Sequence, residues 1–175
     1  MFDRLREDIS TFKRRDPAAR SALEIFFLYP GLKAIRMHRR ANWCYRRRMF
    51  FLARWISQRA ARKTGIEIHP AATIGRRFFI DHGTGVVIGE TCIIGNSCRL
   101  YQGVTLGALS FPKNADGTLT KGIPRHPILE DKVTVYAGAT ILGRVTVGRG
   151  AVIGGNVWIT DDVPAGAKVT QERPS

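Results

Sequence analysis

The stretch from Ile68 to Leu106, IHPAATIGRRFFIDHGTGVVIGETCIIGNSCRLYQGVTL, decides the fold. An aliphatic residue recurs every six positions, and the phase slips once by two residues, between Ile80 and Ile88. Four residues after each aliphatic position stands a small or apolar side chain: Ala72, Phe78, Thr84, Cys92, Cys98 and Val104. A six-residue repeat without the 3.6-residue period of a helix is typical of a β-solenoid. We therefore predict stacked coils, with the aliphatic residues pointing inward and the small residues at the corners.

The repeat is interrupted once and then resumes. Residues 107–127 are rich in glycine and proline, and so long a loop inside a compact repeat is commonly functional. The aliphatic positions then return at Leu129, Val135, Ile141, Val147, Ile153 and Ile159. We predict three parts: a helical segment at 1–65, a β-helix of roughly four to five coils at 66–164 with an extended loop at 107–127, and a C-terminal tail at 165–175.

Residues 1–65 have the apolar spacing of helices. We expect Asp3 to cap a first helix. We expect a break at Asp16 and a second helix that begins at Pro17. Gly65 is expected to be the C-cap of a fourth helix, and Cys44 to be buried. The apolar residues expected on the helices are Leu5, Ile9, Phe12, Leu23, Phe26, Phe27, Leu32, Ile35, Trp43, Phe51, Trp55 and Ile56.

The positive charge is concentrated in the helical segment. Residues 1–65 hold 17 Lys and Arg against 5 Asp and Glu, a surplus of +12. Nucleic acid, anionic lipid or an acidic ligand could meet such a surface, but a solvated helix face explains it as well. The segment has no recognisable nucleic-acid motif, so we expect no nucleic-acid partner. No apolar run reaches the roughly 18–20 residues needed to span a bilayer. The first ten residues contain acidic side chains where a secretory signal would have an apolar stretch. Three cysteines in no metal-like spacing fit a reducing compartment. We therefore expect a cytoplasmic protein without a membrane partner.

The strongest chemical candidate is His82. It stands beside Asp81 where the repeat slips, and a histidine with a pKa of about 6.5 suits a general base acting on a hydroxyl. Glu67 precedes Asp81 by fourteen residues, close to one coil, so it could lie beside His82. Arg125 and His126 end the long loop and could reach across a subunit boundary. Flat coil faces also favour self-association.

The other histidines are weaker candidates. His38 lies in an arginine-rich helix and is expected at the surface, and His69, before a proline, is expected to be structural. Cys92 and Cys98 are expected in the core rather than at a catalytic centre. The zinc site of a solenoid carbonic anhydrase needs two histidines five residues apart, whereas the intervals here are 13 (His69 to His82) and 44. We expect no metal.

Five motifs resemble those of the serine O-acetyltransferases, a family of left-handed parallel β-helix (hexapeptide-repeat) enzymes. They are R-D-P-A at 15–18, I-E-I-H-P-A-A at 66–72, D-H-G-T-G-V-V-I-G-E-T at 81–91, Y-Q-G-V-T-L-G at 101–107 and R-H-P at 125–127. The resemblance covers nearly the whole chain, and it implies a mainly β fold with a short N-terminal helical segment. It also implies transfer of an acetyl group from acetyl-CoA to the hydroxyl of L-serine, giving O-acetyl-L-serine for cysteine biosynthesis. A hexapeptide-repeat acetyltransferase acting on a sugar or xenobiotic hydroxyl is the alternative, and Asp16, in a helical segment that such enzymes lack, argues against it.

The resemblance also implies roles by position. His82 would be the general base in a direct attack, and Glu67 the acid of its dyad. The substrate ammonium would meet two carboxylates, the substrate carboxylate would meet two cations, and the thioester arm would lie in a cleft between subunits. The residues concerned are Asp16 and Asp81 for the ammonium, Arg125 and His126 for the carboxylate, and Gly107 and Ala137 for the arm of acetyl-CoA.

The chain departs from the family pattern in three places. Its helical segment is about half the length found in the long enzymes, Ala108 stands where a second glycine is frequent, and G-V-P-A after the last coil is missing. We expect a homotrimer, with a dimer of trimers less favoured. The sequence ends in Arg173-Pro174-Ser175 rather than in an isoleucine tail, so we expect no tight complex with cysteine synthase.

Overall fold

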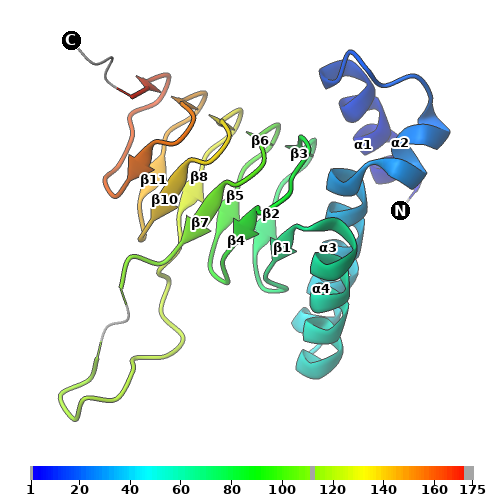
Figure 1. The fold of residues 1–175 in the computed structure, drawn as a ribbon. Coiled ribbons are helices and arrows are strands. Elements are labelled where there is room, and N and C mark those ends of the chain that lie inside the picture. Colours follow the sequence, from blue (N-terminus) through cyan, green and yellow to red (C-terminus); the bar gives the residue numbers. More distant parts are fainter. Residues whose placement is uncertain (1, 111–112, 172–175) are drawn as a thin grey trace.

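The computed structural model describes residues 2–110 and 113–171. Four helices come first: α1 (Phe2–Arg15), α2 (Ala22–Leu28), α3 (Pro30–Arg46) and α4 (Phe50–Thr64). Fourteen short strands follow in the described residues: β1 (Glu67–Ile68), β2 (Thr73–Ile74), β3 (Phe79–Ile80), β4 (Val87–Ile88), β5 (Ile93–Ile94), β6 (Arg99–Leu100), β7 (Thr105–Gly107), β8 (Ile128–Leu129), β9 (Thr134–Val135), β10 (Thr140–Leu142), β11 (Thr146–Val147), β12 (Val152–Ile153), β13 (Trp158–Ile159) and β14 (Lys168–Val169). The helices lie at one end of the stack of coils (Figure 1).

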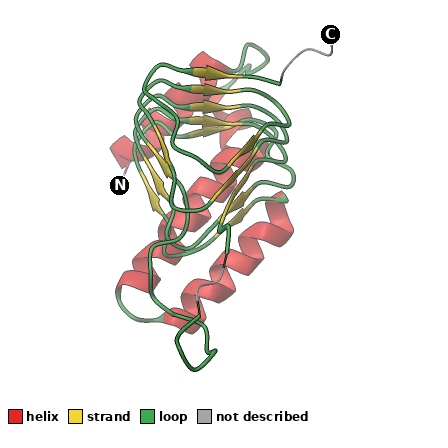
Figure 2. Cartoon of the chain, turned by 90° about the vertical axis from the view of Figure 1, so that its left-hand side faces the viewer, coloured by secondary structure: helices red, strands yellow, loops and turns green. Residues whose placement is uncertain are grey.

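The strands form three parallel sheets, one on each side of a prism (Figure 2). Sheet A has the order β1-β4-β7-β10-β13, sheet B the order β11-β8-β5-β2, and sheet C the order β14-β12-β9-β6-β3. Each coil therefore runs from A to B to C, so its turns lie at an A/B corner, a B/C corner and a C/A corner. Parallel pairing of successive coils confirms the predicted β-helix.

The interior of the prism contains the repeat residues. The aliphatic strand positions except Ile74, which is partly buried, and most of the corner residues are buried, including Cys92 at 1% and Cys98 at 0% exposure. One corner assignment was wrong: Thr84 is exposed, and Val86 is buried in its place. The two-residue slip lengthens this turn, so the corner position is the one two residues before Ile88 rather than four residues after Ile80.

The helical segment begins differently from the prediction. Asp3 lies in the first turn of α1 rather than at its cap, and no helix begins at Pro17. The second helix begins at Ala22 instead, because Ser21 accepts a hydrogen bond from the amide of Glu24, with a nitrogen–oxygen distance of 3.1 Å. The S-A-L-E sequence at 21–24 is thus the stronger start signal.

Helix α3 packs directly on the first coil. A Cβ at Gly31 would lie 2.2 Å from the carbonyl oxygen of Ile80, so only glycine allows this contact. His38, expected at the surface, is buried at 4% exposure because its face of α3 rests on the coil. Several apolar side chains expected on the helices are exposed instead, with Phe51 at 85% and Trp55 at 50%. Cys44 is buried, and Gly65 caps α4 with a φ of 70°.

The two irregular segments differ in how far they leave the prism. The chain between β7 and β8 extends away from the coils (Figure 1), with one antiparallel bridge, Lys113 to Leu119, among its described residues. The segment assigned to the C-terminal tail still contains β14, which pairs with β12. A strand that the hexads did not indicate therefore continues sheet C. None of the described helices is long and apolar enough to cross a membrane.

Candidate active site

The C/A corner of the first coil, residues 81–86, carries Asp81 and His82. The backbone is left-handed at His82, Gly83 and Gly85, with φ values of 53°, 91° and 78°. The imidazole of His82 is exposed and has no side-chain hydrogen bond within the described part of the chain. Its nitrogens are therefore accessible to a substrate hydroxyl, as a general base requires.

Asp16 reaches the same neighbourhood from the end of α1. Its Oδ1 accepts a hydrogen bond from the amide of Ala18 at 2.8 Å, and its Oδ2 accepts one from the hydroxyl of Tyr29 at 2.6 Å. Burial, the hydrogen bond to Asp16 and the surrounding negative charges, including that of Asp81, raise the pKa of Tyr29 to about 12. Asp16 contacts Tyr29 directly, whereas the charge of Asp81, 65 residues further along the sequence, acts on the same hydroxyl without a hydrogen bond.

His126 lies at the A/B corner of the third coil, at the end of the long segment between β7 and β8. Its Nδ1 lies 3.2 Å from the amide nitrogen and 2.9 Å from the hydroxyl oxygen of Thr91, and that oxygen also accepts hydrogen bonds from the amides of Arg125 and His126. Burial, and then the charge of Arg125, lower the pKa of His126. A neutral ring that accepts at Nδ1 carries its proton on Nε2, so Nε2–H is the free donor. A Cβ at Gly89 would lie 1.9 Å from His126 Cδ2, so glycine leaves the space for the ring.

A second polar group lies beside His126 at the A/B corner. Burial, and then the neighbouring Glu90, raise the pKa of Tyr45. Burial lowers the pKa of both His69 and His126, and the charge of Glu90 acts in the opposite direction on each ring. The Nδ1 of His69 accepts a hydrogen bond from the Ala71 amide at 3.2 Å, a local turn contact. The described residues contain no group of three or more His, Cys, Asp or Glu side chains that could hold a metal ion.

Glu67 does not contact His82 in the described chain. It pairs with Val87 in sheet A, and its carboxylate lies 3.9 Å from the guanidinium of Arg54. Both side chains of that ion pair are about half exposed, at 49% and 45%, so the pair is weak and can exchange partners.

The candidate residues divide between the two corners that border sheet A. Asp81, His82 and Ala137 lie at C/A corners, whereas Gly107 and the Arg125-His126 pair lie toward the A/B side. His82 precedes β4 and the Gly89 contact of His126 follows it, so the two histidines lie at opposite ends of that strand. Within one protomer the candidate residues therefore form two separate groups, one at each border of sheet A.

Known proteins combine the same fold and motifs. Residues 126–161 match the model of the bacterial transferase hexapeptide (six repeats). A plasmid serine acetyltransferase of Synechococcus elongatus is 56% identical over 95% of this chain and 52% of its own length. The serine acetyltransferase of Bacillus licheniformis is 53% identical over 93% of this chain and 71% of its own length. The chain belongs to the serine acetyltransferase family.

Solved serine acetyltransferases match nearly all of this chain in structure. The Neisseria gonorrhoeae enzyme in complex with serine has a TM-score of 0.87 at 32% identity, covering 99% of this chain and 68% of the other. The Brucella abortus enzyme in complex with coenzyme A has a TM-score of 0.88 at 31% identity, covering 98% and 65%. The predicted left-handed parallel β-helix is confirmed. This chain spans about half the length of the Synechococcus relative and about two thirds of the others.

Sequence reasoning missed the residues that support the serine acetyltransferase motifs. The sequence did not single out Tyr29, Glu90 appeared within a motif without a role of its own, and neither was connected to another residue. Thr91, the hydroxyl that fixes Arg125 and His126, stands 34 and 35 residues before them, and no local pattern links it to them. Its position immediately after Gly89-Glu90 in the quoted motif is the one signal that could have found it.

Proposed function

We propose that this chain transfers the acetyl group of acetyl-CoA to the hydroxyl of L-serine, giving the O-acetyl-L-serine that cysteine biosynthesis consumes. The observation that carries the proposal is that Asp16 binds the Tyr29 hydroxyl, on which the charge of Asp81 also acts, and that Asp81 immediately precedes the exposed His82. Two carboxylates suit the α-ammonium of an amino-acid acceptor, and His82 then lies beside the acceptor's hydroxyl. A sugar acceptor has no cation for these carboxylates to bind.

In this mechanism His82 removes the proton of the serine hydroxyl as its oxygen attacks the thioester carbonyl. The tetrahedral intermediate collapses with loss of the coenzyme A thiolate, which takes the proton back from His82. Direct attack is favoured over an acyl-cysteine because Cys44, Cys92 and Cys98 are all buried. Burial also raises the pKa of Cys92 to about 12 and that of Cys98 to about 11, so neither is a nucleophilic thiolate at neutral pH. Three free cysteines also fit a cytoplasmic location.

A thiol-release assay with acetyl-CoA tests the acceptor class. L-serine is expected to release coenzyme A at a saturable rate, whereas sugar and chloramphenicol hydroxyls should release it at the background hydrolysis rate. Preferred acetylation of a sugar or antibiotic hydroxyl would replace serine by that acceptor.

The protein acts as a trimer in this proposal, with each site formed by two subunits. The C/A corner of one subunit supplies Asp81, His82 and Ala137, and the A/B corner of its neighbour supplies Gly107, Arg125 and His126. The two halves lie at opposite borders of sheet A, so a single protomer cannot bring them to one substrate. Exposed apolar side chains on that sheet, Val87 at 37% and Trp158 at 65%, support burial of this face between subunits.

Co-expression of two inactive variants tests the shared site. Neither His82→Asn nor His126→Asn should be active alone, but co-expressed chains should regain activity because each mixed trimer contains one junction with both histidines. The readout is thiol release together with trimer mass by sedimentation. A monomer at micromolar concentration, or absence of any recovery in confirmed mixed trimers, would exclude a site shared in this way.

Thr91 provides a matched test of the proposed carboxylate half-site. Thr91→Val removes the hydroxyl without changing the side-chain shape and leaves the amides of Arg125 and His126 without their acceptor. We expect the KM for serine to rise about tenfold or more, with a smaller change in the KM for acetyl-CoA. Thr91→Ser keeps the hydroxyl and should retain nearly normal serine kinetics. Equal kinetics of the valine and serine variants would remove Thr91 from this role.

A further inference from the structure

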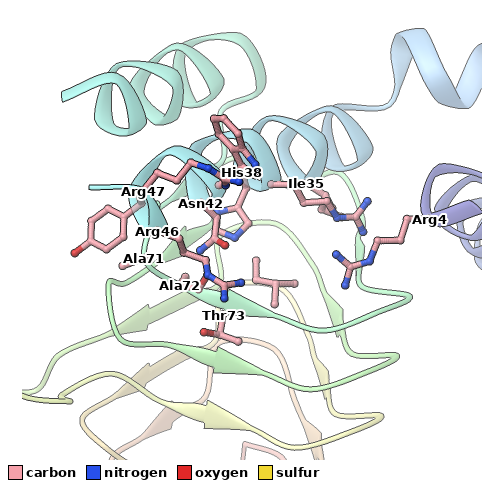
Figure 3. Close-up of a pocket in the computed structure, with 13 residues that line it drawn as sticks. Arg4, Ile35, His38, Asn42, Arg46, Arg47, Ala71, Ala72 and Thr73 are labelled. Carbon is pink, nitrogen blue, oxygen red and sulfur yellow. The ribbon is translucent and has the colours of Figure 1, made fainter. Parts of the chain in front are cut away.

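A groove lies between α1, α3 and the first coil, and none of the residues assigned to catalysis is among those that line it (Figure 3). Its volume is about 1050 Å³, large enough for a small ligand. One wall comes from α1, one from α3, and the base from the Ala71–Ile74 segment of the first coil. The catalytic proposal gives this groove no task.

The groove is lined by four arginines and no acidic residue: Arg4, Arg39, Arg46 and Arg47. Two of these are already engaged. Arg39 forms an ion pair with the buried Asp8, and the Arg47 guanidinium lies 3.8 Å from the centre of the Trp43 ring. Arg4 and Arg46 have no ion pair or hydrogen bond from their side chains in the described ranges 2–110 and 113–171. Two guanidinium groups from different helices thus face one groove without an anion.

His38 supplies an independent sign that a ligand is missing. It lines the groove, is 4% exposed, and its Nδ1 has no hydrogen-bond partner among the described residues. Burial lowers the pKa of His38 to about 4, and a hydrogen bond to the Ala72 carbonyl acts in the opposite direction. The neutral ring donates to that carbonyl, so Nδ1 is a buried acceptor. Leaving a buried polar atom unsatisfied is costly, and a ligand hydroxyl would satisfy it once the side chains that cover Nδ1 move aside.

We propose that this groove binds a small phosphate-bearing molecule, with Arg4 and Arg46 on the phosphate and His38 accepting a hydrogen bond from a P–OH or alcohol group. The planar guanidinium presents paired N–H donors that match phosphate oxygens, and two such groups balance a phosphate dianion. The opening is bounded by walls on both sides, with Arg4 and Arg46 on different sides of it in Figure 3, which suits a compact ligand better than an extended polymer. Part of the positive surplus of residues 1–65 thereby has a binding role.

The test is equilibrium binding of inorganic phosphate and glycerol 3-phosphate to the full chain by calorimetry, at constant ionic strength set with chloride. We expect saturable binding of one molecule per chain, weakened about tenfold or more by Arg4→Gln and by Arg46→Gln. The matched control is Arg62→Gln, an exposed arginine on α4 outside the groove, which should bind within twofold of the unmodified chain. All variants are compared by thermal unfolding, since the three side chains are on the surface and their loss should leave the fold intact.

Two further arms identify the source of the phosphate. Vesicles containing phosphatidic acid and a single-stranded oligonucleotide are offered to the same variants. Binding of the soluble phosphates with loss only in the groove variants supports the proposal. Absence of saturable phosphate binding, equal weakening by Arg62→Gln, or binding confined to vesicles or oligonucleotide would each overturn it. The measurement needs no acetyl transfer, so its result is independent of the proposed catalytic function.

Discussion

Replacement of His82 by asparagine is expected to lower kcat for serine acetylation by about 10²–10⁴-fold, the usual contribution of a positioned general base. Asparagine is the informative choice because His82 has a φ of 53°, a left-handed conformation that asparagine tolerates better than most residues. His82→Ala removes the same base but adds backbone strain, so agreement between the two variants would assign the loss to the imidazole. The KM for acetyl-CoA should change little.

A matched control separates the lost base from a disturbed turn. Lys132 is an exposed residue with a φ of 64° at a B/C corner, so Lys132→Asn makes the same exchange far from the proposed chemistry. It should keep full activity and a normal melting temperature. Glu67→Gln should lose less activity than either His82 variant, because the base itself is kept and Glu67 has no hydrogen bond to it among the described residues. If His82→Asn kept most of its turnover at neutral pH, another group would have to be the base.

The β-helix could be predicted from the sequence because each hexad carries its own information. An aliphatic residue in the strand and a small residue at the corner recur locally, so residues such as Leu129 and Val133 are placed without knowledge of the rest of the chain. The prediction failed where that local rule is broken. The slip after Ile80 moves the corner residue from Thr84 to Val86, and β14 continues sheet C without a hexad pattern.

The helical segment was harder to predict because tertiary packing decides which helix face is buried. The polar side chain of His38 is buried, whereas the apolar side chain of Phe51 is exposed in the protomer. The former is explained by close packing of α3 on the coil at Gly31. The exposed apolar side chains of α4 have no covering partner among the described residues.

The site itself combines what local motifs can and cannot reveal. His82 stands out because a D-H pair coincides with the phase slip. The contacts of Asp16 with Tyr29 and of Thr91 with His126 are long-range consequences of the fold, and no spacing rule anticipates them. The three-sided coil also places the candidate residues at two different corners. Their order in the sequence alone does not reveal this separation.

The second large expected effect is the selectivity for acceptors that carry an α-amino group, and it depends on Asp16. The structure does not place this residue at a helix N-cap: it follows the last residue of α1, and its carboxylate accepts hydrogen bonds from the Ala18 amide and the Tyr29 hydroxyl while remaining partly exposed. Each carboxylate oxygen has a second lone pair, so both contacts are compatible with binding an ammonium. We expect 3-hydroxypropionate, which lacks the α-amino group, to be acetylated with a kcat/KM about 10²-fold or more below that of serine, because two neighbouring carboxylates would lose their cation.

Asp16→Asn should reduce this selectivity in a way that general damage cannot imitate. The amide keeps one oxygen for the Ala18 amide, and its NH2 group can donate to the Tyr29 hydroxyl, so the local fold has a substitute for each contact. Activity with serine should fall through a higher KM, whereas activity with 3-hydroxypropionate should be unchanged or better, which lowers the ratio of the two kcat/KM values about tenfold or more. Tyr29→Phe, which keeps the carboxylate, should preserve most of the ratio. Parallel loss of both activities in Asp16→Asn, together with a lower melting temperature, would assign Asp16 a structural role and leave the ammonium to Asp81 alone.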